Sequence, residues 1–230
     1  MVEKTTRNKT ALSEQVASQI ETMIINQELA VGEKLANEFE LAEQLAVSRS
    51  TIREAMKTLV SKNIVEIRRG RGTYVAENPG LVADPLGLLF LADKQTLSKD
   101  LLAVRQMIEP PIASLAALNR TAAELTELTR LCEEIEVLIH QGVSHKQKDM
   151  EFHACLARAS QNVVVPNLIP IIHSAISVFI DETESRLKEE TIQTHRQILK
   201  AIAEQDPRKA ASSMSQHLTY NQVALENKKQ

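Results

Sequence analysis

Tryptophan is absent from the 230 residues, and aromatic side chains as a whole make up only 3% of them. The core must therefore be aliphatic, and 43% of the residues are hydrophobic, which is enough for two modest domains. The chain has only six glycines and seven prolines, so few helix breakers are present. Alanine, leucine, isoleucine, glutamate and glutamine dominate instead, and this balance predicts a mainly α-helical fold.

Cysteine is nearly absent as well. Cys132 and Cys155 each lie within a helical pattern, which indicates reduced, buried thiols and excludes a disulfide framework. The sequence contains no run of about 18 apolar residues, so we expect no membrane span. The charged first residues are not followed by an apolar segment, so we expect no signal peptide. Together these absences predict a cytoplasmic protein without membrane contact.

The net charge of −3 gives no indication of nucleic-acid binding, but the charge is unevenly distributed. Residues 47–75 contain seven basic and only two acidic side chains, a local excess of five positive charges. Such a patch fits a DNA-binding surface and an ordinary solvated face about equally well. The basic side chains are Arg49, Arg53, Lys57, Lys62, Arg68, Arg69 and Arg71.

The N-terminal third reads as helices followed by a hairpin. Residues 1–9 are polar and are expected to form a disordered tail. A helical period then begins at Leu12, and two short helices follow at residues 37–46 and 49–62, with Asn37 and Ser48 as N-caps. Two strand-like runs flank a segment that contains two glycines, which predicts a β-hairpin. We therefore predict a winged helix-turn-helix at residues 10–77.

The remaining chain is predicted to be an all-helical antiparallel bundle. A turn at residues 78–80 marks the domain boundary, residues 78–95 form a linker with a connecting helix, and the bundle spans residues 96–226. Pro110 and Pro111 predict a kink in one bundle helix. Thr96, Thr121 and Ser144 stand at expected N-caps. Helical periods fall near 82–92, 96–118, 122–140, 145–160, 165–184, 188–204 and 207–226.

The third predicted helix has the chemistry of a DNA-reading element. Its N-terminal end would enter the major groove, where an arginine can donate two parallel hydrogen bonds to guanine. Hydroxyl groups and the amides of a helix N-terminus suit phosphates. The candidate contacts on this helix are Ser48, Arg49, Ser50, Thr51 and Arg53. The hairpin tip adds contacts to the DNA backbone or the minor groove through Arg69, Gly70, Arg71 and Gly72.

These segments closely resemble the DNA-binding signature of the GntR family. The resemblance rests on residues 35–43 (LANEFELAE), 47–55 (VSRSTIREA) and 69–75 (RGRGTYV). It implies that Arg49 and Arg53 contact bases or nearby phosphates. The family commonly has proline where this chain has Ala36, and arginine where it has Phe39. The second departure removes a DNA contact that the family pattern implies and affects the expected operator sequence.

Polar side chains also fall on inward faces of the predicted bundle. Asp149 and His153 are four residues apart and share a helix face with Phe152, while His195 and His217 lie among apolar neighbours. One carboxylate with several imidazoles is a common ligand set for a divalent metal. A single inward histidine is more often a hydrogen-bonded core residue, so the pattern alone leaves both interpretations open. His140 and His145 flank a glycine turn and are expected at the surface.

Residues 96–226 resemble the FadR-type C-terminal domain of the same family. The similar motifs are residues 104–109 (VRQMIE), 115–117 (LAA), 149–153 (DMEFH), 160–162 (SQN) and 195–202 (HRQILKAI), followed by His217. The resemblance implies a divalent transition metal, with zinc favoured and nickel, manganese and iron open. The implied ligands are Asp149, His153, His195 and His217.

Arg105 lies in an apolar stripe and therefore needs a negative partner. One interpretation pairs it with Glu109 or another core carboxylate. The other makes it a bidentate clamp for the carboxylate of an effector. Members of the family often respond to hydroxy acids, sugar acids or dicarboxylates, and Asn162 and His173 are further candidates for contacting such an acid. A helix cap would explain Asn162 equally well, and a satisfied core histidine would explain His173.

The sequence thus predicts a homodimeric regulator, because one winged helix reads only half of a two-fold operator. The resemblance to the family implies that it is a repressor. A small carboxylate effector bound at the metal would control DNA binding. One alternative is a purely structural metal without an effector. Another is an enzyme in which the metal activates water, but Glu151 lies off the inward face and provides no general base.

Overall fold

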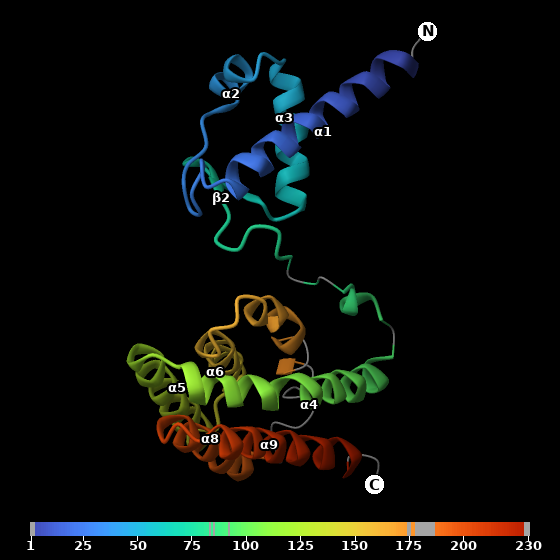
Figure 1. Cartoon of the computed structure of the whole chain (residues 1–230). Coiled ribbons are helices and arrows are strands. Elements are labelled where there is room, and N and C mark those ends of the chain that lie inside the picture. Colours follow the sequence, from blue (N-terminus) through green and yellow to red (C-terminus); the bar gives the residue numbers. More distant parts are fainter. Residues whose placement is uncertain are drawn as a thin grey trace. The chain divides into compact units, whose positions relative to one another are not determined.

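The computed structural model describes residues 3–82, 84, 86–91, 93–173, 176–177 and 187–227. The chain divides into two compact units, Met1–Ala83 and Asp84–Gln230, which are coloured along the sequence in Figure 1. Helices dominate both units, and the strands form a two-stranded sheet. The predicted mainly α-helical fold, with a winged helix-turn-helix and a C-terminal helical bundle, is confirmed.

The N-terminal unit contains three helices and a hairpin. The helices are α1 (Glu3–Ile25), α2 (Glu38–Gln44) and α3 (Arg49–Ser61), and the strands are β1 (Val65–Arg68) and β2 (Gly72–Val75). The strands pair antiparallel, with Val65 opposite Val75 and Arg68 opposite Gly72. The segment that we expected to be a disordered tail belongs to α1 from Glu3 onwards. Its sequence contains no proline or glycine before residue 26, so nothing interrupts the helix.

Local caps and an aliphatic core hold this unit together. Asn37 forms the predicted N-cap of α2, where its side chain accepts hydrogen bonds from the amides of Phe39 and Glu40. The core side chains come from all three helices and the hairpin. The most buried include Val16, Ile20, Ile52, Ala55, Leu59, Val65 and Val75.

The C-terminal unit is a helical bundle. Its helices are α4 (Lys94–Asn119), α5 (Ala122–His140), α6 (Lys146–Ala159), α8 (Lys188–Ala203) and α9 (Pro207–Asn227). Thr121 caps α5 as predicted, through a hydrogen bond from the Glu124 amide. Helix α4 begins before Thr96, and the N-cap of α6 is His145 rather than Ser144.

Two predicted helices differ in the structure. In place of a helix at 82–92, the described residues contain only the short 3-10 helix η1 (Leu88–Phe90), preceded by Gly87 with a φ of 66°. The left-handed conformation of Gly87 and the proline at position 85 of the sequence account for the missing α-helix, because both residues oppose one. The helix expected at 165–184 begins with the 3-10 helix η2 (Val165–Leu168), and the described residues at 169–173 and 176–177 are helical. The rest of that prediction lies outside the described residues.

Helix α4 is the central helix of this bundle. It lies alongside α9, as Figure 1 shows, and also contacts α6 and α8. The helix continues through Pro110 and Pro111 to Asn119. By length and composition its segment Thr96–Asn119 could span a membrane, but about half of its apolar stretch is buried inside the protein, as in the core helix of a bundle. Cys132 and Cys155 are free and buried in the same core, as predicted.

Candidate functional sites

The N-terminal end of α3 presents polar side chains on a fixed backbone. Oγ of Ser48 accepts a hydrogen bond from the Thr51 amide at 3.2 Å, which caps the helix. The same oxygen lies 2.8 Å from the hydroxyl groups of Ser50 and Thr51. Arg49 and Ser50 are exposed, whereas Thr51 is buried. Of the predicted contacts on α3, Thr51 therefore supports the turn rather than facing outward.

Arg53 is exposed, but it has a partner in the same unit. Its Nη2 and Nε donate to the carboxylate of Glu38 on α2, at 2.9 and 3.4 Å. The hydrogen bond from Arg53 lowers the pKa of Glu38, so the carboxylate is ionised at neutral pH. Both side chains remain substantially exposed. A surface pair of this kind contributes little stability, so Arg53 can exchange Glu38 for another anion at small cost.

The wing carries two further exposed arginines. Its tip is closed by a hydrogen bond from the Arg71 amide to the Arg68 carbonyl at 2.8 Å, and both Arg69 and Arg71 are exposed. Gly70 and Gly72 have φ angles of 74° and 116°, which side-chain-bearing residues rarely adopt. The hairpin therefore presents exposed guanidinium groups on a tight turn.

Phe39 stands out on α2 because 55% of its surface is exposed. It follows Glu38, the partner of Arg53, so it belongs to the helix that contacts the reading end of α3. An exposed aromatic ring can contact the methyl group of thymine but offers no hydrogen bond to phosphate. The surface is therefore apolar where the resemblance implies an arginine.

Three histidines from three helices meet inside the C-terminal unit. His153 on α6, His195 on α8 and His217 on α9 each offer a nitrogen, and these atoms all lie within 4.8 Å of one another. The three side chains are at most 4% exposed. Phe152 stacks on His195 with a ring separation of 4.6 Å and limits the movement of that ring. The predicted inward histidines are thus brought together.

Asp149 borders this cluster and is itself buried. Its Oδ1 lies 3.3 Å from Nε2 of His195, and its Oδ2 lies 3.9 Å from Nε2 of His153. Neither Asp149 Oδ1 nor His195 Nε2 has a hydrogen-bond partner among the described residues. Buried polar atoms without partners are rare and costly. A carboxylate oxygen and imidazole nitrogens that converge in this way are the donor set of a divalent transition metal, so the residues fit such an ion.

His217 is oriented by a hydroxyl group. Its Nδ1 lies 2.9 Å from Oγ1 of Thr194, and that hydroxyl donates its own proton to the Glu190 carbonyl at 2.7 Å. Thr194 must therefore accept a hydrogen bond from Nδ1–H of His217. The lone pair of His217 then resides on Nε2, which is the arrangement that a metal-ligating histidine needs.

A buried ion pair adjoins His153. The guanidinium of Arg105 contacts the carboxylate of Glu109 through Nε and Nη2, and both side chains are about 2% exposed. Oε2 of Glu109 also lies 2.5 Å from Nδ1 of His153. Burial alone would raise the pKa of Glu109, but the positive charge of Arg105 beside it and the hydrogen bond from that guanidinium outweigh burial and lower the pKa. Glu109 is therefore the negative partner that the buried Arg105 needs.

Two imidazoles of the cluster, those of His195 and His217, are held neutral. Burial, together with the positive groups nearby, lowers the pKa of His195 and of His217 well below the usual histidine value. Neutral imidazole is the form that binds a metal, so these two rings need lose no proton first. With neutral imidazoles, the buried set of Arg105, Glu109 and Asp149 has a net charge of −1.

Family models match both units of the chain. The model of bacterial regulatory proteins of the gntR family covers residues 12–75, and the FCD domain model covers residues 100–220. This chain belongs to the GntR family. It is a DNA-binding transcriptional regulator with an FCD effector domain of the FadR type, and it is not an enzyme. FCD domains are known for binding metal ions, and this chain has a cluster of three buried histidines that could hold one.

Relatives of this GntR regulator are regulators too. The chain is 35% identical to the HTH-type transcriptional regulator LutR of Bacillus subtilis, over 86% of this chain and 93% of that protein. It is 31% identical to the Glc operon transcriptional activator of Escherichia coli, over 90% and 86%. The solved structure of Streptococcus agalactiae GntR has a TM-score of 0.78 and 39% identity, covering 90% of this chain and 98% of that one.

The remaining residues predicted in the FCD domain lie outside the histidine cluster or at its edge. Asn162 is exposed, and its Oδ1 accepts from the amides of Val164 and Val165, so the alternative role as a cap fits the structure. His173 is half-buried, with Nε2 3.1 Å from the Met150 carbonyl, and burial lowers its pKa. His145, which we expected at the surface, is buried one turn before Asp149.

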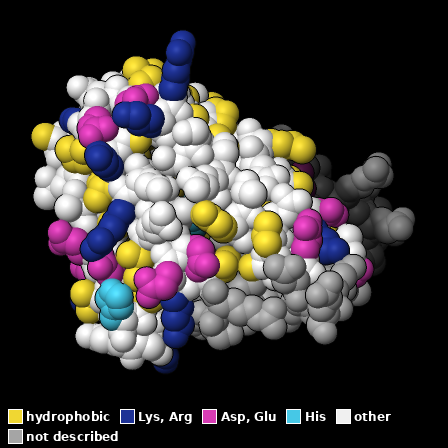
Figure 2. All heavy atoms as spheres, turned by 90° about the horizontal axis from the view of Figure 1, so that it is seen from below, with side chains coloured by type: hydrophobic (Ala, Val, Ile, Leu, Met, Phe, Trp, Pro, Cys, Tyr) yellow, Lys and Arg dark blue, Asp and Glu magenta, His cyan; other side chains and the backbone are white. Residues whose placement is uncertain are grey.

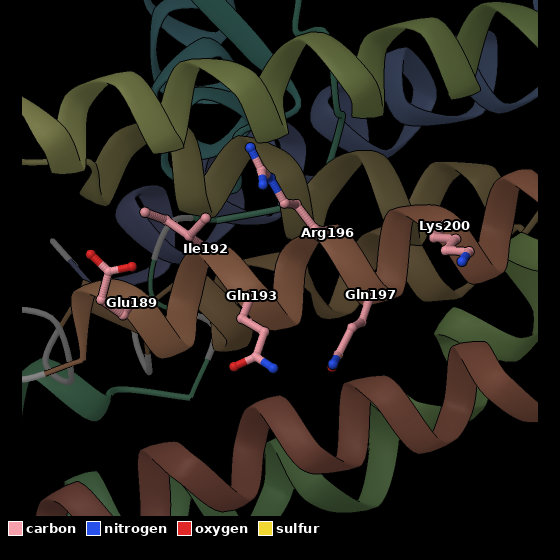
Figure 3. A pocket seen from close by; sticks show the side chains of 6 residues that line it. All are labelled: Glu189, Ile192, Gln193, Arg196, Gln197 and Lys200. Carbon is pink, nitrogen blue, oxygen red and sulfur yellow. The ribbon is translucent and has the colours of Figure 1, made fainter.

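The surface groove along α8 differs in its chemistry from the buried histidine cluster. A groove along α8 is lined by Glu189, Ile192, Gln193, Arg196, Gln197 and Lys200, and Figure 3 shows Gln193 and Gln197 on the opposite side of the helix from Arg196. Arg196 pairs with Glu136 on α5. The groove contains none of the predicted site residues. On the face drawn in Figure 2, basic and acidic side chains are mixed, unlike the local excess of basic groups at residues 47–75.

Proposed function

We propose that this GntR regulator is a repressor that releases its operator when a small organic acid binds at a divalent metal in the FCD domain. The proposed ligands are Asp149, His153, His195 and His217. The proposal rests on the convergence of buried potential metal ligands from three helices. Among these ligand atoms, Asp149 Oδ1 and His195 Nε2 have no hydrogen-bond partner in the described part of the chain. When bound, the cation supplies a Lewis-acid position for an oxygen of the acid.

The charges of the buried residues favour a monocarboxylic acid. Arg105 is neutralised by Glu109, so Asp149 leaves the site at −1 when the imidazoles are neutral. A divalent cation changes this to +1, and one carboxylate then brings the site to neutrality. A dicarboxylate would leave an excess negative charge in a buried site, which is costly. We propose a small hydroxy acid or sugar acid, with Arg105 and His173 as its contacts.

DNA recognition is proposed to need two copies. Ser48, Arg49, Ser50 and Arg53 on α3, with the wing arginines, form a surface for one half-site. A homodimer would place two such surfaces on a two-fold operator in the cytoplasm. Binding of the acid would favour one placement of the two DNA-binding units over another.

Thermal unfolding tests the sensor. The full-length protein would be stripped of metal, reloaded with Zn²⁺, and melted with and without a panel of small mono- and dicarboxylic acids. We expect Zn²⁺ to raise the melting temperature, and one monocarboxylate to raise it further only when Zn²⁺ is present. His153→Ala should abolish both shifts. Stabilisation by Zn²⁺ but by no acid would indicate a purely structural metal.

The sign of regulation needs a separate assay. Operator binding would be followed by fluorescence anisotropy at fixed salt, because protein–DNA affinities depend steeply on it. We expect the stabilising acid to weaken operator binding. An acid that tightens binding would identify an activator and contradict repression.

A further inference from the structure

Arg105 makes a second buried contact, with the histidine that should bind the metal. Its Nη2 lies 3.3 Å from Nε2 of His153. A guanidinium is always protonated and only donates, so Nε2 of His153 must be the acceptor. The lone pair that accepts from Arg105 is the same lone pair that would coordinate an ion.

We infer that Arg105 blocks the coordinating nitrogen of His153 in the metal-free protein, and that metal binding frees its guanidinium for the acid. The inference rests on the proposed metal site and concerns the regulation of that site. It makes Arg105 both a competitor of the metal and, after metal binding, a contact of the acid. The metal would then have to bind first.

Glu109 lowers the free-energy cost of moving the Arg105 guanidinium away from His153. Its carboxylate contacts Nε of Arg105 and also lies within 2.5 Å of Nδ1 of His153. Arg105 can therefore give up His153 through Nη2 while Nε stays paired with Glu109. Losing all partners would leave an unpaired buried charge, which is strongly destabilising. The negative carboxylate beside Nδ1 also favours the His153 tautomer with its proton on that nitrogen, and in this tautomer Nε2 can bind a cation.

Electrostatics gives the movement its direction. A cation bound by Nε2 of His153 would lie next to the positive guanidinium, and like charges repel strongly in a buried site. Arg105 would then be better placed beside an incoming carboxylate, to which its planar group can donate two hydrogen bonds. Before the metal binds, the same guanidinium is committed to Glu109 and His153, and the site carries no excess positive charge.

The opposite view makes Arg105 a mere support of His153. If Arg105 only held Glu109 and the imidazole in place, its removal would disorder a ligand and weaken metal binding. If Arg105 competes with the metal, its removal strengthens metal binding. The sign of the change in Zn²⁺ affinity therefore separates the two.

The experiment is a competition titration of Zn²⁺ between the full-length metal-stripped protein and a chromophoric chelator. We expect Arg105→Gln to bind Zn²⁺ about tenfold more tightly than the wild type, because a charged hydrogen bond to Nε2 is lost. Glu109→Gln should bind it about tenfold more weakly, because Nδ1 of His153 loses its carboxylate. Lys99→Gln, an exposed charge on the same helix, is the control and should change the affinity less than about twofold.

Unchanged or weaker Zn²⁺ binding by a folded Arg105→Gln variant would overturn the inference and leave the metal site intact. If that variant does not fold, Arg105→Lys replaces it, because lysine keeps the charge but loses the planar fork; tighter binding supports the inference and weaker binding opposes it. If neither the wild type nor the variants bind Zn²⁺, the metal site itself fails, and the inference fails with it.

Discussion

The two units place their functional side chains in opposite environments. In the N-terminal unit, Arg49, Arg53 and the wing arginines are exposed on short elements that neighbouring residues cap. In the C-terminal unit, the candidate ligands are buried, and they come from α6, α8 and α9. The first unit can therefore change its partner by side-chain motion alone, as Arg53 would in leaving Glu38. The second can change state only by rearranging charges inside a packed core.

This contrast has an energetic consequence. Exposed arginines can be removed with little effect on folding, because surface pairs are worth about 1 kcal/mol or less. Buried polar groups are linked, so removing one leaves another unsatisfied. Mutations in the N-terminal unit should thus separate DNA binding from stability, whereas those in the C-terminal unit should couple ligand binding to stability.

The largest expected effect is on the metal. His195→Ala should lower the affinity for Zn²⁺ by more than about 100-fold, because even outer-shell partners of a metal ligand contribute about 10- to 100-fold. The measurement is competition with a chromophoric chelator. His173→Ala is the matched control, since His173 is a half-buried histidine of the same unit that contacts the Met150 carbonyl. Equal Zn²⁺ affinities for the two variants would show that the cluster is not the site.

Loss of an arginine at the reading helix should rank next. Arg49→Ala should weaken operator binding by about 1–3 kcal/mol if the arginine contacts a guanine. Anisotropy titrations with operator DNA measure this loss, and the melting temperature should stay unchanged because Arg49 is exposed. Lys57→Ala, an exposed residue of α3 that pairs with Glu54, serves as the control. A similar loss in both variants would indicate general charge attraction instead of base recognition.

A smaller effect is expected at the cap of α3. Ser48→Ala should destabilise the N-terminal unit by about 1 kcal/mol, because the Thr51 amide loses its hydrogen-bond acceptor. Chemical denaturation followed by circular dichroism measures the change. Ser50→Ala removes a hydroxyl two residues later without removing the cap, so its stability should stay within about 0.5 kcal/mol of the wild type. Equal destabilisation by both changes would contradict a specific capping role.

The smallest effect is expected from restoring the family arginine. Phe39→Arg adds a charge at an exposed position, so it should tighten operator binding a few-fold and steepen the salt dependence by about one unit in the slope of log K against log salt. Titrations at several salt concentrations test this. Phe39→Gln, which removes the ring without adding charge, is the control. Weaker binding in both variants would show that the ring itself contacts the operator.

Local sequence signals predict the wing and several helix caps in both units. The caps at Asn37, Ser48 and Thr121 depend on residues two or three positions away, and all three are confirmed. Strand pairing in the wing follows from two short runs around a glycine turn. The prediction of a helix at residues 82–92 is wrong for the described residues, because a proline and a glycine interrupt the apolar periodicity there.

The candidate site was predicted only in part. Helical spacing placed Asp149 and His153 on one face, but spacing cannot show which helices meet. The contact between Glu109 and His153 joins α4 to α6, and the contact between Thr194 and His217 joins α8 to α9. Both contacts depend on tertiary packing, so no sequence motif predicts them. Glu109 was foreseen as a partner of Arg105 because the two residues lie one turn apart on the same helix.

The two buried cysteines bear on how this regulator behaves under oxidative stress. Burial raises the pKa of Cys132 to about 11 and also raises that of Cys155. At neutral pH both are therefore thiols rather than the thiolates that react with peroxides and disulfides. The packing that holds the histidines together thus also keeps these two thiols unreactive. An oxidant in the cell would leave both side chains unmodified while the domain stays folded.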